Sequence, residues 1–301
     1  MADASFSYIV SALPAYVKEN QELISKSIAF GTPSVKRFTP MDVKYKAKLN
    51  FLGISGAFQN GKGCATEYNA TATMTNREIT TAVLEKKLRI CPDTLLGKWP
   101  EYLVRVPADK RDSLPFEAYL IAELIANVND ELEELVWQGS VSGGDLIDGL
   151  LTILAGEQTA VTTTIASGTS KWAGIQQIIS AVPAMLRKKA IKVYVAPEYF
   201  TALAFELVAL NLYHFNPGTP VESLTVPGTN IEVVNTIGLA GSGKAVASID
   251  ENIFYGTDDA DAQNRAKVGY NEEHGYFFMN VRFNAGVQVA FPDWCVLATI
   301  A

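Results

Sequence analysis

The stretch PFEAYLIAELIANVNDELEELVWQG, residues 115–139, carries the strongest periodic signal in the 301-residue chain. Large apolar residues recur every four positions along it, which is typical of a helix with one buried face. Pro115 suits the first turn of a helix, and Gly139 supplies a stop. We therefore expect a helix over residues 115–138, about 35 Å long, which is enough to span a whole domain. The apolar positions are Phe116, Leu120, Leu124, Val128, Leu132 and Val136, flanked by Ile121, Ile125 and Leu135.

The other sides of this predicted helix are covered by carboxylates, namely Glu123, Asp130, Glu131, Glu133 and Glu134. Paired carboxylates on helices bind metal in some four-helix bundles, but those sites also use Glu-x-x-His pairs, and the sequence has none. The pattern therefore favours a charged face, either solvated or in contact with another subunit, over a metal site. Glu123, Asp130 and Glu134 are the candidate intersubunit contacts on this helix.

Residues 39–80, upstream of the helix, are predicted to form a long two-stranded ribbon. The runs VKYKAKL (residues 43–49) and ATATMT (residues 70–75) both alternate in the manner of strands. Between them, QNGKG (residues 59–63) is typical of a turn. An isolated hairpin is barely stable in water, so the ribbon should lie on something else. Two alternatives stay open: a surface hairpin on its own domain, or an arm that reaches a neighbouring subunit.

The ribbon also carries basic and aromatic residues that could contact another copy. Its lysines suit either a solvated face or an acidic neighbour, such as the long helix of a second subunit. The candidate intersubunit contacts of the ribbon are Lys44, Lys46, Lys48, Phe51, Phe58 and Lys62.

The rest of the chain is predicted to contain an arm, an α/β block and a β-rich end. Residues 1–38 resemble an arm with a short helix from Pro14 to about Ile28. Strands and helices alternate between Thr159 and Leu210, which indicates an α/β layer, and two further strands are expected at 231–234 and 245–249. One helix there should begin near Lys171 and bend or end at Pro183. The strands expected outside this block are 79–91, 276–283, 287–291 and 294–300, with a polar loop over 257–274.

Composition and charge exclude several classes of protein. The chain is 48% hydrophobic and 19% charged, which excludes a disordered chain, a coiled coil and a collagen. Its net charge of −7 argues against a dedicated nucleic-acid binder, which needs a basic footprint, but allows a container for nucleic acid. No run of 18 apolar residues is present and the first residues do not resemble a secretory signal, so we expect no membrane span and no export.

No motif in the sequence points to catalysis, a cofactor or a metal. GLAGSGK (residues 238–244) resembles a phosphate-binding loop, but Ala245 follows where a Ser or Thr would hold magnesium, and the next segment is predicted to be a strand rather than a helix. Too few cysteines and histidines are present, at spacings too wide, to indicate a zinc site or a catalytic pair. These residues are Cys64, Cys91, Cys295, His214 and His274.

The order of the predicted elements resembles the major capsid protein of tailed double-stranded DNA bacteriophages, which has the Hong Kong 97-type fold. Three stretches add to this resemblance. They are ELEELVWQG with the following GLL (residues 131–139 and 149–151), IKVYVAPEY (residues 191–199) and VRFNAGVQVAFPDW (residues 281–294).

The resemblance implies an α+β fold with five parts. We expect an N-terminal arm at 1–38, an extended loop (the β-ribbon) at 39–80, a peripheral domain at 81–145 with its spine helix at 115–138, an α/β axial domain at 146–250, and C-terminal strands at 251–301 that return through the peripheral and axial domains.

The resemblance also implies a structural role: self-assembly into hexamers and pentamers of an icosahedral shell that encloses double-stranded phage DNA. The expected partners are further copies of the chain, a portal, scaffold or decoration proteins, and the packaged DNA through weak non-specific contact. No enzyme activity, cofactor or membrane is expected, and the protein would be assembled in the host bacterial cytoplasm and reside in the virion. Two alternatives stay open: an encapsulin-type compartment shell, and a nucleotide-binding enzyme that uses Gly238 to Lys244.

Overall fold

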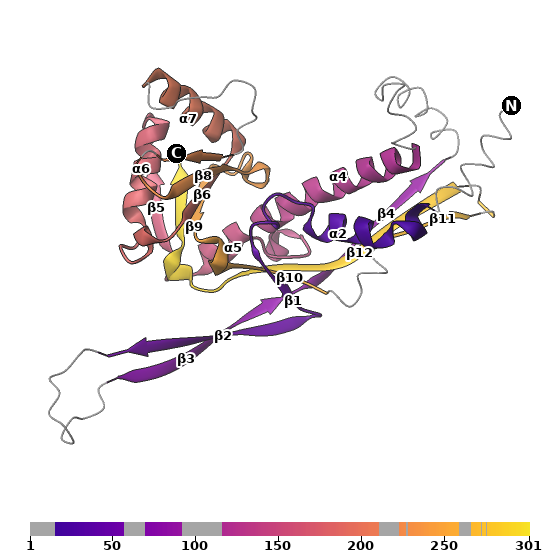
Figure 1. Ribbon diagram of the computed structural model, residues 1–301, viewed down its shortest axis with the longest axis horizontal. Helices are drawn as coiled ribbons and strands as arrows, with labels where there is room; N and C mark the ends of the chain where they lie inside the picture. The colour runs from indigo at the N-terminus through magenta and orange to yellow at the C-terminus, as the bar shows by residue number, and fades with distance from the viewer. Residues whose placement is uncertain are drawn as a thin grey trace.

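A computed structural model of the chain is shown in Figure 1. The candidate contacts Phe58 and Lys62, the predicted turn at 59–63, and also Cys64 and His214 lie outside the residues that the structure describes. The described residues are 16–56, 70–91, 116–210, 223–226, 228–258, 266–271, 273–274 and 276–301.

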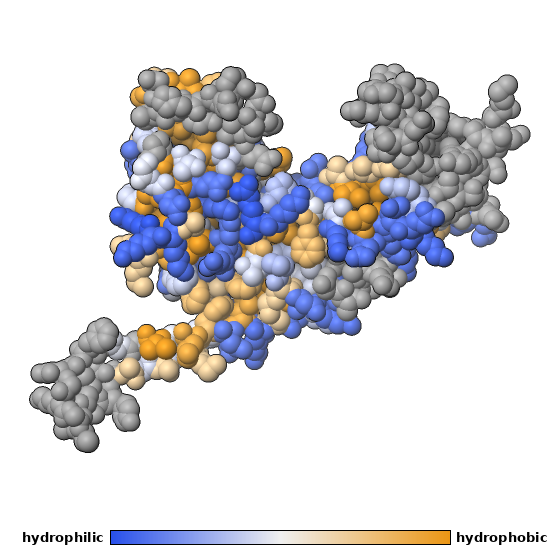
Figure 2. Space-filling view, viewed as in Figure 1, coloured by the Kyte–Doolittle hydropathy of each residue, from blue (hydrophilic) through white to orange (hydrophobic). Residues whose placement is uncertain are grey.

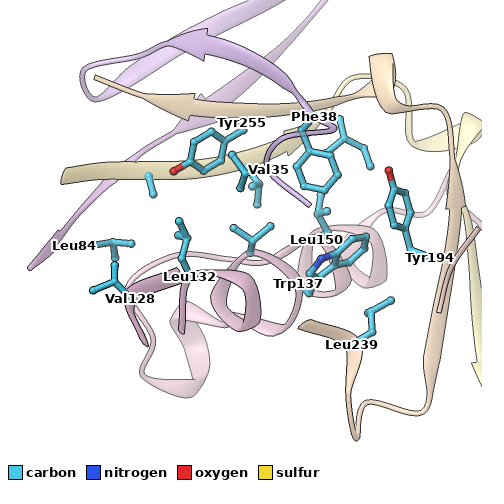
Figure 3. Packing of buried hydrophobic residues seen from close by; sticks show 14 of the residues in the cluster. Val35, Phe38, Leu84, Val128, Leu132, Trp137, Leu150, Tyr194, Leu239 and Tyr255 are labelled. Atoms are coloured by element: carbon cyan, nitrogen blue, oxygen red, sulfur yellow. The ribbon is translucent and has the colours of Figure 1, made fainter. Parts of the chain in front are cut away.

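A long helix packed on an antiparallel sheet forms one layer of the molecule, which we call the peripheral layer. Helix α4 spans Phe116–Gln138, which confirms the predicted spine helix. Its buried residues Val128 and Leu132 lie near Leu84 of the sheet (Figure 3), and Met279 of the sheet belongs to the same core. The apolar spacing of four residues therefore marks the face that packs on the sheet. The strands of this layer are β4 (Ala82–Ile90), β11 (Ala266–Asn271) and β12 (Tyr276–Val289).

Strand β12 is a single strand of 14 residues, so the prediction of two separate strands was wrong. Gly286 falls between the two predicted strands, but it lies inside β12 and pairs with Gly256 of β10. The predicted loop over 257–274 was also wrong in part, because β11 occupies its second half. Strand β10 (Ile253–Thr257) pairs with β12 and, in parallel, with β1 (Thr39–Asp42), while α2 (Gln21–Phe30) lies against α4.

The second layer, which we call the axial layer, is a six-stranded sheet with two helices on one face. Alternate residues of β6 explain this arrangement: Val193 and Val195 face the helices, whereas Tyr194 faces the core shared with α4. Helix α6 stops at Ala181, two residues before Pro183. The strand order is β5 (Val161–Ile165), β13 (Val296–Ile300), β9 (Lys244–Ser248), β6 (Ile191–Val195), β8 (Ile231–Asn235) and β7 (Ser223–Thr225), and the helices are α6 (Lys171–Ala181) and α7 (Pro197–Ala209).

Short helical segments join the strands and helices within and between these layers. Helix α5 follows α4 closely, and Gly149, at its start, fits against the backbone of Trp137 where a Cβ would clash. The short helices are α5 (Leu150–Gly156) and the 3₁₀ turns at Val141–Gly143, Leu186–Lys188, Ile237–Leu239, Asp250–Asn252 and Pro292–Trp294.

The two layers meet at a cluster of three buried aromatic side chains (Figure 3). Trp137 comes from the end of α4, Phe38 from the segment before β1, and Tyr194 from the axial sheet. The Trp137 ring centroid lies 5.0 Å from that of Tyr194 and 5.9 Å from that of Phe38. Such tilted and edge-on pairs add to the energy of burial, so this cluster fixes the junction of the layers.

Candidate functional site

The two-stranded ribbon projects from the body of the molecule (Figure 1). Strand β2 (Lys46–Ser55) pairs antiparallel with β3 (Thr71–Thr80) over ten residue pairs, and among the described residues neither strand joins another sheet. This confirms the extended β-ribbon. The predicted strand 79–91 began too early, because Ile79 belongs to the ribbon and β4 begins at Ala82.

The apolar face of the ribbon changes sides where the ribbon leaves the body. Close to the body, Leu49 and Ile79 are buried on one face, and the opposite face carries the charged residues Lys48 and Glu78. Further out, the charged face continues as an apolar face, and the other face becomes a row of threonines. The outer apolar residues are Leu52, Ile54 and Met74, exposed by 60%, 73% and 75%, and Ala72, which is paired with Ile54.

Figure 2 shows apolar surface along the projecting part of the ribbon. Leu52 and Met74 are directly opposite each other, with Ile54 two residues along the same strand, so the three side chains form one patch. We call Leu52, Ile54 and Met74 the outer apolar patch. A contiguous exposed apolar patch marks an interaction surface.

The root of the ribbon crosses the sheet of the peripheral layer through a close backbone contact. Thr81, between β3 and β4, donates its N–H to the Tyr45 carbonyl at 2.8 Å, and the Asn284 side chain of β12 donates to the Lys44 carbonyl at 2.8 Å. A Cβ on Gly286 would clash with the Thr80 carbonyl. Glycine is therefore required at the point where the ribbon passes over β12.

The predicted lysine contacts lie on exposed positions at the base of the ribbon. Lys46 and Lys48 share one face of β2, and Lys44 precedes the strand. Lys46 donates to Glu78 across the ribbon at 2.6 Å, and this hydrogen bond lowers the pKa of the exposed Glu78 carboxyl. The charged face of the ribbon base is thus partly neutralised within the copy, and an exposed pair of this kind adds little to stability.

Phe51 lies against the body of its own copy. Its ring centroid is 4.6 Å from that of Phe291, which stacks in turn on Trp294 at 4.3 Å. The other predicted aromatic contact, Phe58, falls outside the described residues.

The three carboxylates proposed as contacts on α4 lie on one exposed stripe. Glu123, Asp130 and Glu134 are spaced by seven and four residues, which places them on the same side of the helix. Glu131 pairs with Lys86 of β4 at 2.6 Å. Glu133 was wrongly assigned to the outer face, since it is only 3% exposed.

Glu133 faces inward because the N-terminal segment supplies donors for it. Ser34 donates both its backbone N–H, at 3.2 Å, and its hydroxyl to the carboxylate, and Trp137 Nε1 donates to the Ser34 hydroxyl oxygen at 2.8 Å. Burial raises the pKa of the Glu133 carboxyl, and the hydrogen bonds from Ser34 oppose this rise. The contact spans 99 residues of sequence, so no local pattern indicates it.

The segments that resembled catalytic or binding motifs form structural turns. Gly241 and Gly243 have positive φ and turn the chain into β9, which begins at Lys244, so a strand follows the glycine-rich segment as predicted. Burial raises the pKa of the Cys295 thiol to about 11. Within the described ranges no group of three or more His, Cys, Asp or Glu side chains is placed to hold a metal ion, and none of the helices there has the length and apolarity needed to cross a membrane.

Sequence reasoning missed the outer apolar patch. The signal was present as a shift in the alternation of β2, because apolar residues occupy the odd positions Leu49 and Phe51 and then the even positions Leu52 and Ile54. A shift by one residue moves the apolar side chains to the opposite face of a strand.

Comparisons with known proteins identify the fold but not a sequence family. The sequence matches no family model and no curated protein. Among solved structures, the chain is similar to one from Gordonia phage Cozz, with a TM-score of 0.60 and 12% identity over 89% of this chain and 86% of that one.

Two further solved structures show the same likeness. A chain from the procapsid of satellite phage P4 that includes the size determination (Sid) protein has a TM-score of 0.61 and 13% identity, and covers 93% of this chain and 90% of its own. A virus-like particle from Pyrococcus furiosus has a TM-score of 0.52 and 8% identity, with 93% and 98% covered. The chain therefore has the α+β Hong Kong 97-type fold of phage major capsid proteins.

Proposed function

We propose that this chain is a structural protein that self-assembles into hexamers and pentamers of an icosahedral shell around double-stranded phage DNA. The observation that carries the proposal is the outer apolar patch on the ribbon. Within the described residues the body packs on the opposite face of the ribbon as far as Phe51 and leaves the patch exposed, so the patch is available to another molecule. A second copy of the chain supplies that surface in a symmetric assembly.

The charges of the chain fit contacts between copies better than strong binding of DNA. The exposed stripe of Glu123, Asp130 and Glu134 and the lysines at the ribbon base carry opposite charges on separate elements. The net charge of −7 suits weak, non-specific contact with packaged DNA. In this proposal the portal and any scaffold or decoration proteins bind to assembled copies, and assembly takes place in the host bacterial cytoplasm before the shell becomes part of the virion.

The proposed parts of the subunit follow the elements of the structure. Residues 39–80 would reach over a neighbour, 81–145 and 146–250 would form the peripheral and axial domains, and 251–301 would link them. In this division residues 16–38, the described part of the N-terminal arm, belong to the peripheral side, since Ser34 is bound to α4 and α2 packs on the same helix.

An encapsulin-type compartment that encloses protein is the second candidate. The likeness to the virus-like particle from Pyrococcus furiosus favours it. Negative-stain images of the purified chain, followed by extraction of nucleic acid from nuclease-treated particles, distinguish the candidates. Closed shells with protected DNA support the phage capsid, shells with protein cargo and no nucleic acid support the compartment, and the absence of shells contradicts both.

Deleting residues 52–66 tests the role of the ribbon in this assembly. The remaining body keeps its two cores, so we expect a folded chain with a circular dichroism spectrum close to that of the parent. We also expect it to form no closed shells. Normal particles from the deleted chain would contradict the proposed role of the ribbon.

A further inference from the structure

The ribbon is fixed to the body at a second level, beyond its root, by one arginine and one aromatic ring. Arg77 of β3 forms an ion pair with Glu157, and its Nη2 lies 3.5 Å from the Gln288 side-chain oxygen. Gln288 in turn donates to the Glu78 carbonyl of the ribbon at 2.9 Å. On the neighbouring strand, the Phe51 ring packs on Phe291. We call Arg77 and Phe51, with their partners Glu157 and Phe291, the clasp.

The two partners in the clasp both lie shortly before strands of the axial sheet. Glu157 follows α5 and lies four residues before β5. Phe291 precedes the turn that leads into β13, and β13 pairs with β5 throughout its length. The root of the ribbon is attached to the peripheral layer, and Gln288 of β12 adds a contact to that layer. Glu157 and Phe291 attach the ribbon to the two segments that enter the axial layer.

No described ribbon side chain beyond the clasp is buried. Residues 52–54 and 70–76 are all exposed, whereas Arg77 and Phe51 are partly buried. Six residues of β3 extend from Arg77 to Thr71, or about 20 Å of strand. A tilt of about 10° at the clasp therefore moves Thr71 by about 3.5 Å, which exceeds the tolerance of a packed apolar contact.

We propose that Arg77 and Phe51 are positioning residues that fix the direction of the ribbon relative to the axial sheet and so aim the outer apolar patch at its neighbour. This inference rests on the proposed shell function, because the direction of the ribbon matters only if another copy of the chain binds the outer apolar patch. The geometry predicts that the ribbon follows the axial layer when the two layers move. Without the clasp, the ribbon would pivot on its root at Thr81.

Spin-label distance measurements on the full chain test this proposal directly. Labels are placed at Thr73→Cys on the ribbon and Gln176→Cys on α6, in a chain that carries Cys64→Ser and Cys91→Ser and keeps the buried Cys295. The labelled chain is diluted into an excess of unlabelled chain, so that only distances within one copy are measured. We expect a single narrow distance distribution in the parent.

Variants of the clasp should broaden this distribution. Arg77→Gln and Glu157→Gln each remove one side of the ion pair, and we expect either to at least double its width without lowering the melting temperature by more than a few degrees. Arg77→Lys should retain the parent width, because the arginine contacts its partners through a single nitrogen that an ammonium can replace. Lys46→Gln removes an exposed pair on the opposite face of the ribbon and is the matched control.

This experiment can refute the clasp proposal and the proposed shell function independently of each other. A parent distribution as broad as that of Arg77→Gln, or an unchanged width in both Arg77→Gln and Glu157→Gln, overturns the clasp whether or not shells form. Broadening in both variants but not in Lys46→Gln supports the clasp. If no preparation yields shells, that absence of shells overturns the shell function alone and leaves the clasp supported. If one variant fails to fold, the other decides the outcome.

Discussion

Replacing Leu52, Ile54 and Met74 together with threonine should prevent the chain from assembling at concentrations at which the parent forms shells. Threonine keeps a strong preference for strands, so the ribbon itself should persist. The three side chains are exposed by 60%, 73% and 75%, which corresponds to about two fully exposed apolar side chains. Covering them stabilises a contact between copies by about 3–6 kcal/mol, so the association constant of each contact should fall roughly 10²–10⁴-fold.

Sedimentation velocity over a range of protein concentrations, with negative-stain imaging of the fractions, measures this effect. The matched control carries Thr71→Ser, Thr73→Ser and Thr75→Ser, which change the opposite face of the same ribbon by the same number of residues. We expect the control to assemble as the parent does. Shells formed by the threonine variant at the parent's concentration would refute the reasoning that the patch is buried between copies.

Three further predictions concern the body of the molecule. Trp137→Ala should destabilise the chain by about 3–5 kcal/mol in chemical unfolding, because it empties the fully buried aromatic junction. Gly286→Ala should cost about 1–3 kcal/mol in the same assay, since its Cβ would meet the Thr80 carbonyl, whereas Gly156→Ala, with open space around it, should be near neutral. Burial raises the folded-state pKa of the Glu133 carboxyl, so the stability that this shift contributes is present at low pH and is lost as the pH rises through that pKa. Glu133→Gln should therefore flatten the fall in melting temperature as the pH rises above the ordinary carboxyl pKa of 4.5, and an unchanged fall would contradict this.

Local patterns in the sequence correctly predicted the elements whose apolar residues repeat at a regular spacing. The four-residue spacing within 115–139 located α4 because one face of that helix packs on a sheet along its length. Alternation within 43–49 and 70–75 located the two strands of the ribbon. The glycine-rich segment 238–244 was correctly predicted to lead into a strand, because the residues after it are apolar and β-prone.

The errors came from contacts between residues distant in sequence. Two separate strands were predicted where β12 is continuous. Gly286 lies inside this strand and lets the backbone at Thr80 pass over it, and nothing near Gly286 in the sequence indicates that crossing. Glu133 was assigned to a charged face because its neighbours in sequence are acidic, although Ser34 binds it in the core. Both roles depend on tertiary packing, which overrides local preference.

The candidate contacts on the ribbon illustrate the same limit. The lysines were predicted to contact another subunit because they alternate with apolar residues, yet the structure pairs Lys46 with Glu78 of the same copy. The shift in alternation between Phe51 and Leu52 is visible in the sequence, but its meaning depends on where the body ends beneath the ribbon. The outer apolar patch could therefore be predicted as a change of face, but not as an exposed surface.

Electron microscopy of the purified chain tests most directly whether one copy needs neighbouring copies to cover its ribbon. The images are taken at concentrations from well below to well above the onset of any association. We predict closed particles of uniform size whose subunits each extend a ribbon onto an adjacent subunit, with density over Leu52, Ile54 and Met74. Single compact molecules at every concentration, with the ribbon folded back on its own body, would contradict the account.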